Sequence, residues 1–173
     1  MTALTCIIGI DPGSEGAIAS IWPESGLLGV WNIPLRKEVR SRTFTYVDGT
    51  KLGALLRHLN PNAAWLEKVH SIPSDGHVGA FTFGDNFGSL RTANEVIGIP
   101  VHQVDPQVWK SNLRAPTDKN AARERAYKLF PNCPRLFSRP DKAEAAMIAL
   151  YGVMHMGIKF NPIIRPYDGG FKP

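Results

Sequence analysis

The feature that most constrains this chain is a short apolar run that ends in an acidic residue and a tight turn. Residues 4–10 are mostly apolar, and Asp11, Pro12 and Gly13 follow them directly. A run of this length closed by a turn signal predicts a buried strand with a carboxylate at its tip. Small residues around Asp11 leave room for a metal ion or a phosphate near the backbone. The alternative is that Asp-Pro-Gly only forms a favourable turn.

The pattern after this turn predicts a mixed α/β sheet. Two further strands, residues 17–22 and 27–33, form an antiparallel meander with the first strand. A helix capped by Asp48 then leads to a fourth strand, residues 63–69, which is typical of a parallel crossover. The remaining elements that we expect are a fifth strand at 100–104 and helices at 86–97, 107–113, 118–130 and 140–155.

Two segments between these elements are expected to be loops. Residues 34–49 interleave basic and aromatic side chains, namely Arg36, Lys37, Arg40, Arg42, Phe44 and Tyr46. Such a loop suits a nucleic-acid contact, and the alternative is a solvated surface loop. Residues 70–85 are rich in Gly, Ser and aromatic residues and should overhang the end of the fourth strand. Phe81, Phe83 and Phe87 would either stack on bases or anchor that loop to the core.

Composition restricts the class of protein and its partners. At 173 residues, with 43% apolar and 20% charged residues, the chain is long enough for one globular domain. We assign residues 1–158 to this domain and residues 159–173 to an irregular or disordered, Pro/Gly-rich tail. The net charge of +5 favours a polyanionic partner such as nucleic acid. We expect a cytoplasmic protein with two free thiols and no membrane segment.

Three further acidic residues stand at positions where a carboxylate needs an explanation. Glu67 lies near the end of the apolar fourth strand, where it is either an edge charge, a salt-bridge partner or a metal ligand. Asp141 and Glu144 are three residues apart in the first turn of the last helix and therefore share a face. Acidic residues also suit a helix N-terminus through the helix dipole, which is the simpler explanation for this pair.

Taken together, the four carboxylates predict a divalent metal site. If strands one and four are neighbours, Asp11 and Glu67 converge, and the last helix can add Asp141 and Glu144. Four such groups repel one another unless cations bind between them, and all-oxygen ligation favours Mg²⁺ or Mn²⁺. Two ions about 4 Å apart would clamp a scissile phosphate. Lys110 and Lys119 would offset the phosphate charge.

The chain resembles the RuvC family of Holliday-junction resolvases, in the RNase H-like superfamily. The motifs that carry the resemblance are GIDPG at 9–13, LEKV at 66–69, QVWK at 107–110, DKNA at 118–121 and DKAEAAMIALYG at 141–152. They occur in the family's order over residues 4 to 155. The resemblance implies a five-stranded mixed sheet with helices on both faces. It also implies a homodimer whose two active sites cut symmetric strands of four-way or branched DNA.

The resemblance also assigns roles to individual residues. Asp11, Glu67, Asp141 and Glu144 match the metal-binding carboxylates, with two Mg²⁺ ions expected per site and Mn²⁺ as a substitute. The basic residues expected to contact DNA are Lys110, Lys119 and Arg123, of which the two lysines also support catalysis. Where bacterial members usually carry Asp, this chain has Glu144, and where many carry His it has Asp141. The compact form is similar to bacteriophage relatives that debranch replicated DNA.

Three other functions are compatible with parts of the same pattern. An RNase H-fold nuclease acting on an RNA–DNA hybrid or a ribosomal RNA precursor would use the same four carboxylates. A non-catalytic junction-binding protein would have the same fold, but it has no reason to keep four mutually repelling acids. A phosphotransferase of the actin and sugar-kinase type also opens with a strand, an Asp and a glycine turn, but it needs a second domain that this chain lacks.

Overall fold

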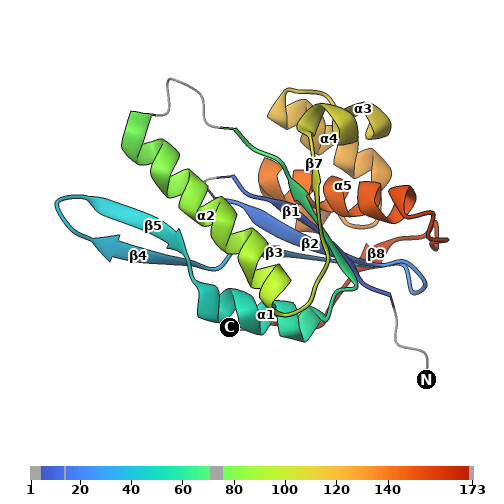
Figure 1. The fold of residues 1–173 in the computed structure, drawn as a ribbon. Coiled ribbons are helices and arrows are strands. Elements are labelled where there is room, and N and C mark those ends of the chain that lie inside the picture. The colour runs from blue at the N-terminus through green and yellow to red at the C-terminus, as the bar shows by residue number, and fades with distance from the viewer. Residues whose placement is uncertain (1–4, 14, 71–75, 172–173) are drawn as a thin grey trace.

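A six-stranded mixed sheet forms the centre of the molecule, and helices cover both of its faces (Figure 1). The structure is a computed structural model that describes residues 5–13, 15–70 and 76–171. The sheet strands are β1 (Ile7–Asp11), β2 (Ala17–Trp22), β3 (Leu27–Asn32), β6 (Ala63–Glu67), β7 (Val101–Val104) and β8 (Arg165–Pro166), in the spatial order β7-β6-β1-β2-β3-β8. β1 is antiparallel to β2 and parallel to β6, which explains how a meander and a crossover share one sheet.

The two faces of the sheet carry separate hydrophobic cores. The helices are α1 (Gly49–Leu59), α2 (Gly76–Val96), α3 (Pro106–Leu113), α4 (Lys119–Leu129) and α5 (Pro140–His155). Alternation along β1 places Ile7 in the core under α5 and Ile8 in the core under α1. α5 packs so tightly on β1 that a Cβ atom at Gly9 would lie 2.2 Å from the backbone nitrogen of Ala149. Small residues on both elements therefore fix the position of α5.

Most predicted elements are confirmed. All five expected strands are present, and the expected α1, α3, α4 and α5 lie within a few residues of their predicted bounds. Asp48 caps α1 as predicted, since its Oδ1 accepts a hydrogen bond from Lys51 N at 3.1 Å. The sixth strand, β8, comes from the segment expected to be an irregular tail.

The expectation that residues 34–49 form a loop is wrong. They contain a two-stranded antiparallel hairpin, β4 (Leu35–Val39) and β5 (Thr43–Val47), followed by the N-cap and start of α1. β5 reads Thr-Phe-Thr-Tyr-Val, a sequence of β-branched and aromatic residues that favours a strand. The basic residues of β4 masked this pattern.

The expectation for residues 70–85 is wrong from Gly76 onward, and residues 71–75 lie outside the described residues. α2 begins at Gly76 and not at Asn86. The several glycines of α2 disfavour a helix, but Phe87 and Leu90 pack into the same hydrophobic core as Ile8 and the buried leucines of α1. Tertiary packing therefore outweighs the local preference.

The C-terminal segment packs on the sheet and is less irregular than expected. β8 pairs in parallel with β3, and Ile164 beside it is buried in the core. The ring of Tyr167 lies 4.7 Å from that of Trp22. Within the described residues, no helix combines the length and the apolar character that crossing a membrane requires.

Candidate metal centre at one edge of the sheet

Strand register places two of the predicted carboxylates side by side. Asp11 is the last residue of β1 and Glu67 is the last residue of β6. The two strands are parallel with Ile10 opposite Leu66, so the next residue of each strand stands at the same edge of the sheet. Buried apolar residues precede each carboxylate, because these strands are covered on both faces.

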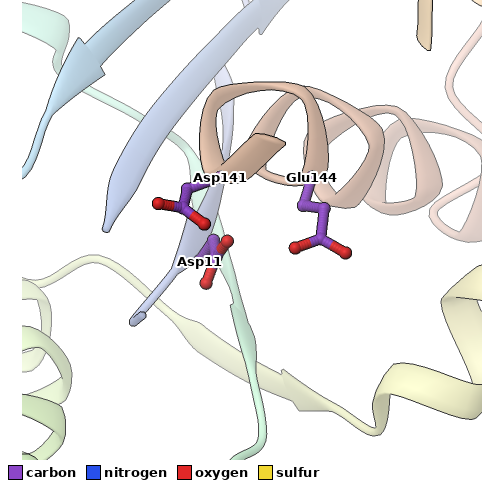
Figure 2. Close-up of side chains that lie close together, drawn as sticks. All are labelled: Asp11, Asp141 and Glu144. Atoms are coloured by element: carbon purple, nitrogen blue, oxygen red, sulfur yellow. The ribbon is translucent and has the colours of Figure 1, made fainter. Parts of the chain in front are cut away.

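The first turn and a half of α5 brings the other two carboxylates to this edge. One carboxylate oxygen from each of Asp11, Asp141 and Glu144 lies within 4.8 Å of the other two (Figure 2). Asp11 and Glu144 are buried, and Asp141 is partly exposed. Asp11 Oδ1 accepts a hydrogen bond from Gly13 N at 2.9 Å, so the tight turn after β1 orients the carboxylate. The Asp-Pro-Gly segment therefore forms a tight turn and also orients the Asp11 carboxylate.

Arg139 ties the start of α5 to the end of the sheet. It is the N-cap residue of α5, and its Nη2 donates to Asn32 Oδ1 at 3.2 Å and to Glu15 O at 3.1 Å. Its Nη1 also pairs with the Glu15 carboxylate. These contacts hold the helix that carries Asp141 against the turn that follows Asp11. Sequence reasoning missed Arg139, because nothing in its local pattern indicates partners so distant in the chain.

Burial and the repulsion between the carboxylates raise the pKa values of Asp11 and Glu67. Burial, and then the charges of Glu67 and Glu144, raise the pKa of Asp11 from 3.8 to about 8. Burial raises the pKa of Glu67 as well, and the nearby Glu144 adds to that shift. Such repulsion makes the site unfavourable as a set of free anions and favourable for a cation.

Both predicted lysines pair with carboxylates of this cluster. Lys110 Nζ lies 2.7 Å from Glu144 Oε1, and Lys119 Nζ lies 3.4 Å from Asp141 Oδ1. Burial alone would lower the pKa of Lys119, but Asp141 and the other carboxylates raise it overall. The lysines come from α3 and α4, so three separate helices contribute charge to one edge of the sheet.

Glu67 is close to the cluster but not part of it. Its Oε2 accepts a hydrogen bond from the indole nitrogen of Trp109 at 2.7 Å. Trp109 is a fully buried residue of α3, so its hydrogen bond holds the Glu67 carboxylate in a fixed position. The structure thus brings three of the four predicted ligands together and holds the fourth beside them. The Trp109 contact was not predicted, because a Trp in an amphipathic helix normally indicates only core packing.

Arg123 is placed less favourably than the two lysines for a contact with the carboxylate cluster. It lies on α4, half-buried, and its Nε has no hydrogen-bond partner among the described residues. Neither the salt bridges nor the hydrogen bonds of the described residues connect it to the carboxylates. Its predicted DNA contact stays a prediction.

The donor set fits a hard divalent cation. The cluster offers only carboxylate oxygens, on elements fixed by packing, which is the chemistry that Mg²⁺ and Mn²⁺ prefer. The buried free thiols, Cys6 and Cys133, lie in the two hydrophobic cores and do not belong to it. Burial raises their pKa values, to about 12 and about 11, so both are poor ligands.

Comparison with known proteins identifies the fold. No protein-family model matches the sequence, and no curated protein matches it either. Among solved structures, Thermus thermophilus RuvC in complex with a Holliday junction substrate matches with a TM-score of 0.59 and 16% identity, over 90% of this chain and 99% of that one. A second Thermus thermophilus RuvC structure gives a TM-score of 0.58 at 16% identity, with the same coverage.

A third solved structure is more distant. The yeast mitochondrial Holliday junction resolvase Ydc2 matches with a TM-score of 0.47 and 15% identity, over 86% of this chain and 78% of that one. The two RuvC matches confirm the expected RuvC-like fold, with its mixed sheet between layers of helices. The matches extend over nearly the whole of each RuvC chain, so the similarity concerns the complete fold and not a single motif.

Proposed function

We propose that this protein is a metal-dependent endodeoxyribonuclease that resolves Holliday junctions and other branched DNA. One observation carries the proposal: three carboxylates gather within 4.8 Å at the edge of a RuvC-like sheet, with two lysines paired to them. A purely structural role does not require charges of one sign to be buried together. The net charge of +5 suits a polyanionic substrate.

The residues that would hold divalent cations are Asp11, Asp141 and Glu144, with Glu67 beside them as the fourth carboxylate. Two Mg²⁺ ions, when bound, supply a water of lowered pKa and stabilise charge on the leaving 3′ oxygen. The Gly13 and Trp109 hydrogen bonds orient Asp11 and Glu67, so the ligand oxygens need little rearrangement. Orientation of this kind is the protein's main contribution in a metal nuclease.

Lys110 and Lys119 have a second task in this proposal. Their charges lie against Glu144 and Asp141, where they compensate the acids in the absence of cations. A phosphodiester that enters the site offers them new anionic partners, so the same side chains would position the DNA backbone. Lys119 is largely exposed and suits this contact better than the more buried Lys110.

A homodimer is part of the proposal, because two symmetric cuts need two sites. The test for it is sedimentation of the full chain, with and without DNA. A dimer in either condition supports paired cutting, and a monomer in both contradicts it.

The activity is tested with end-labelled substrates of matched sequence: an immobile four-way junction, a linear duplex and an RNA–DNA hybrid. Each is incubated with Mg²⁺, Mn²⁺ or EDTA. The proposal requires paired symmetric nicks in the junction only, with 5′-phosphate and 3′-hydroxyl ends, that disappear in EDTA. Cutting of the hybrid or the duplex alone would instead favour an RNase H-fold nuclease of another specificity. Binding of the junction without cutting would favour a non-catalytic binding protein.

A further inference from the structure

The β4–β5 hairpin begins at the same edge of the sheet as the carboxylates. Asp11 pairs with Ala17, and Ala17 pairs with Asn32, so these residues form one row across three strands. β4 starts three residues after Asn32, and the hairpin projects beyond the end of the sheet (Figure 1). Two interstrand spacings separate Asp11 from Asn32, which is roughly 10 Å. The base of the hairpin therefore lies near the proposed active site, and among the described residues no hairpin side chain belongs to the carboxylate cluster.

The hairpin is strongly basic and exposed. It carries four basic residues, Arg36, Lys37, Arg40 and Arg42, and one acidic residue, Glu38. The side chains of Arg36 and Arg40 are 56% and 63% exposed, although both pair with Glu38. Lys37 and Arg42 have no ion-pair partner among the described residues. Glu38 therefore neutralises only part of the positive charge, and the basic side chains are exposed to solvent.

An aromatic layer supports the arginines. Phe44 and Tyr46 stack with ring centroids 6.2 Å apart. The guanidinium of Arg36 lies 5.3 Å from the Tyr46 ring, and that of Arg42 lies 5.0 Å from the Phe44 ring. A guanidinium held against a ring keeps its N–H donors free at the edges while losing rotamer freedom in advance. Such preorganisation reduces the entropy lost when a phosphate binds.

The direction of the hairpin is fixed by one side chain of α2. Asn86 Oδ1 accepts from Val47 N at 2.8 Å, and Asn86 Nδ2 donates to Thr45 O at 3.1 Å. The amide thus pairs with β5 as another strand would. These two hydrogen bonds anchor the end of β5 to α2 and so hold the base of the basic hairpin in place.

We propose that the β4–β5 hairpin is an arm that grips the phosphate backbone of a duplex segment next to the cleavage site. The inference rests on the proposed function, which supplies DNA as the partner. A five-residue strand spans about 17 Å, or about five base-pair steps, so the arm can reach several consecutive phosphates. A polyanion suits the hairpin better than a protein partner does, because four of its eight exposed residues are arginine or lysine and only one of its residues is acidic.

The test compares junction binding by the wild type and by the triple variant Arg36→Gln, Arg40→Gln, Arg42→Gln, in EDTA over a range of salt concentrations. Loss of three phosphate contacts should weaken binding at least about tenfold and reduce the salt slope by up to about 2.7. The matched control is Arg57→Gln, Lys128→Gln, Arg135→Gln, which removes the same charge from exposed positions on α1, on α4 and after α4. It should change the slope far less.

Several results would overturn the inference. An unchanged affinity of the arm variant would mean that the hairpin does not contact the DNA, and an equal loss in the control variant would mean that only overall charge matters. A change in sedimentation mass of the arm variant would mean that the hairpin joins two copies of the chain. If the triple variant fails to fold, Lys37→Gln with Arg42→Gln answers the same question, because neither residue has an ion-pair partner within the described residues.

The experiments distinguish a failure of the arm inference from a failure of the proposed function. If the wild type cuts junctions and the arm variant binds them normally, only the arm inference is wrong. If the wild type does not cut any branched DNA, the proposed function itself is wrong.

Discussion

The carboxylate edge and the basic hairpin stand at the same end of the sheet, but they differ in how their side chains are held. Asp11 and Glu144 are buried and are fixed by strand register and by the packing of α5 on β1. The arginines of the hairpin are exposed and lie against two aromatic rings, while Asn86 holds the backbone of β5. A buried site tolerates little displacement, whereas exposed charges contribute to binding almost independently. Changes at the edge should therefore act on chemistry and stability, and changes on the hairpin on affinity and salt dependence.

The largest effect expected is the loss of cleavage in Asp11→Asn. The amide removes one anionic ligand from the centre of the cluster, so junction cleavage should fall at least about a thousandfold, or about 4 kcal/mol. Junction binding should stay within a few-fold of the wild type. Single-turnover cleavage and equilibrium binding on the same substrate measure both quantities. Cleavage at the normal rate would remove Asp11 from the site.

The next largest effect is expected from Gly9→Ala, which tests whether packing positions the edge. The new methyl group would collide with the backbone of α5 near Ala149 and should destabilise the fold by about 3 kcal/mol. The matched control is Gly84→Ala on α2, where nothing lies within 4 Å of the added atom. It should stabilise the protein by about 0.5 to 1 kcal/mol. Chemical denaturation measures both, and equal stability of the two variants would contradict the packing argument.

Stability of the metal-free protein should depend on pH through Asp11. Burial and the neighbouring acids raise its pKa to about 8. Between its unfolded value near 3.8 and that value, the folded state binds more protons than the unfolded state, so stability falls as pH rises. The slope is at most about 1.4 kcal/mol per pH unit. Denaturation in EDTA from pH 4 to 8 should show this loss in the wild type and less of it in Asp11→Asn; identical profiles would contradict it.

The smallest effect is expected from Lys119→Ala, because Lys119 shares one property with each of the two regions. Lys119 is exposed like the hairpin arginines but pairs with Asp141 of the cluster. Its removal should reduce the salt slope of junction binding by about 1. Lys128→Ala, on the same helix α4 but exposed in its last turn, is the control and should leave the slope unchanged. A Lys119 variant with an unaltered slope would exclude this residue from the DNA contacts.

Sequence patterns predicted the sheet because its strands are short apolar runs closed by turns, and they predicted α5 because Pro140 and the acidic first turn mark its start. They predicted that the carboxylates of Asp11, Glu67, Asp141 and Glu144 converge, and all of these except Glu67 gather in one cluster. They did not predict the contacts of Trp109 and Arg139, which join residues 42 and 124 positions apart in the chain. The hairpin and the first half of α2 were missed, because basic and glycine-rich residues concealed elements that tertiary contacts stabilise.

Anomalous diffraction from crystals of the full chain soaked in Mn²⁺ would show whether the carboxylate edge binds a metal ion. We expect an anomalous peak about 2.1 Å from carboxylate oxygens of Asp11, Asp141 and Glu144, with the lysine ammonium groups moved away from them. Crystals of Asp11→Asn should lose most of that peak. A wild-type crystal without a peak at these residues, with Lys110 still paired to Glu144, would contradict the assignment of this edge as a metal centre.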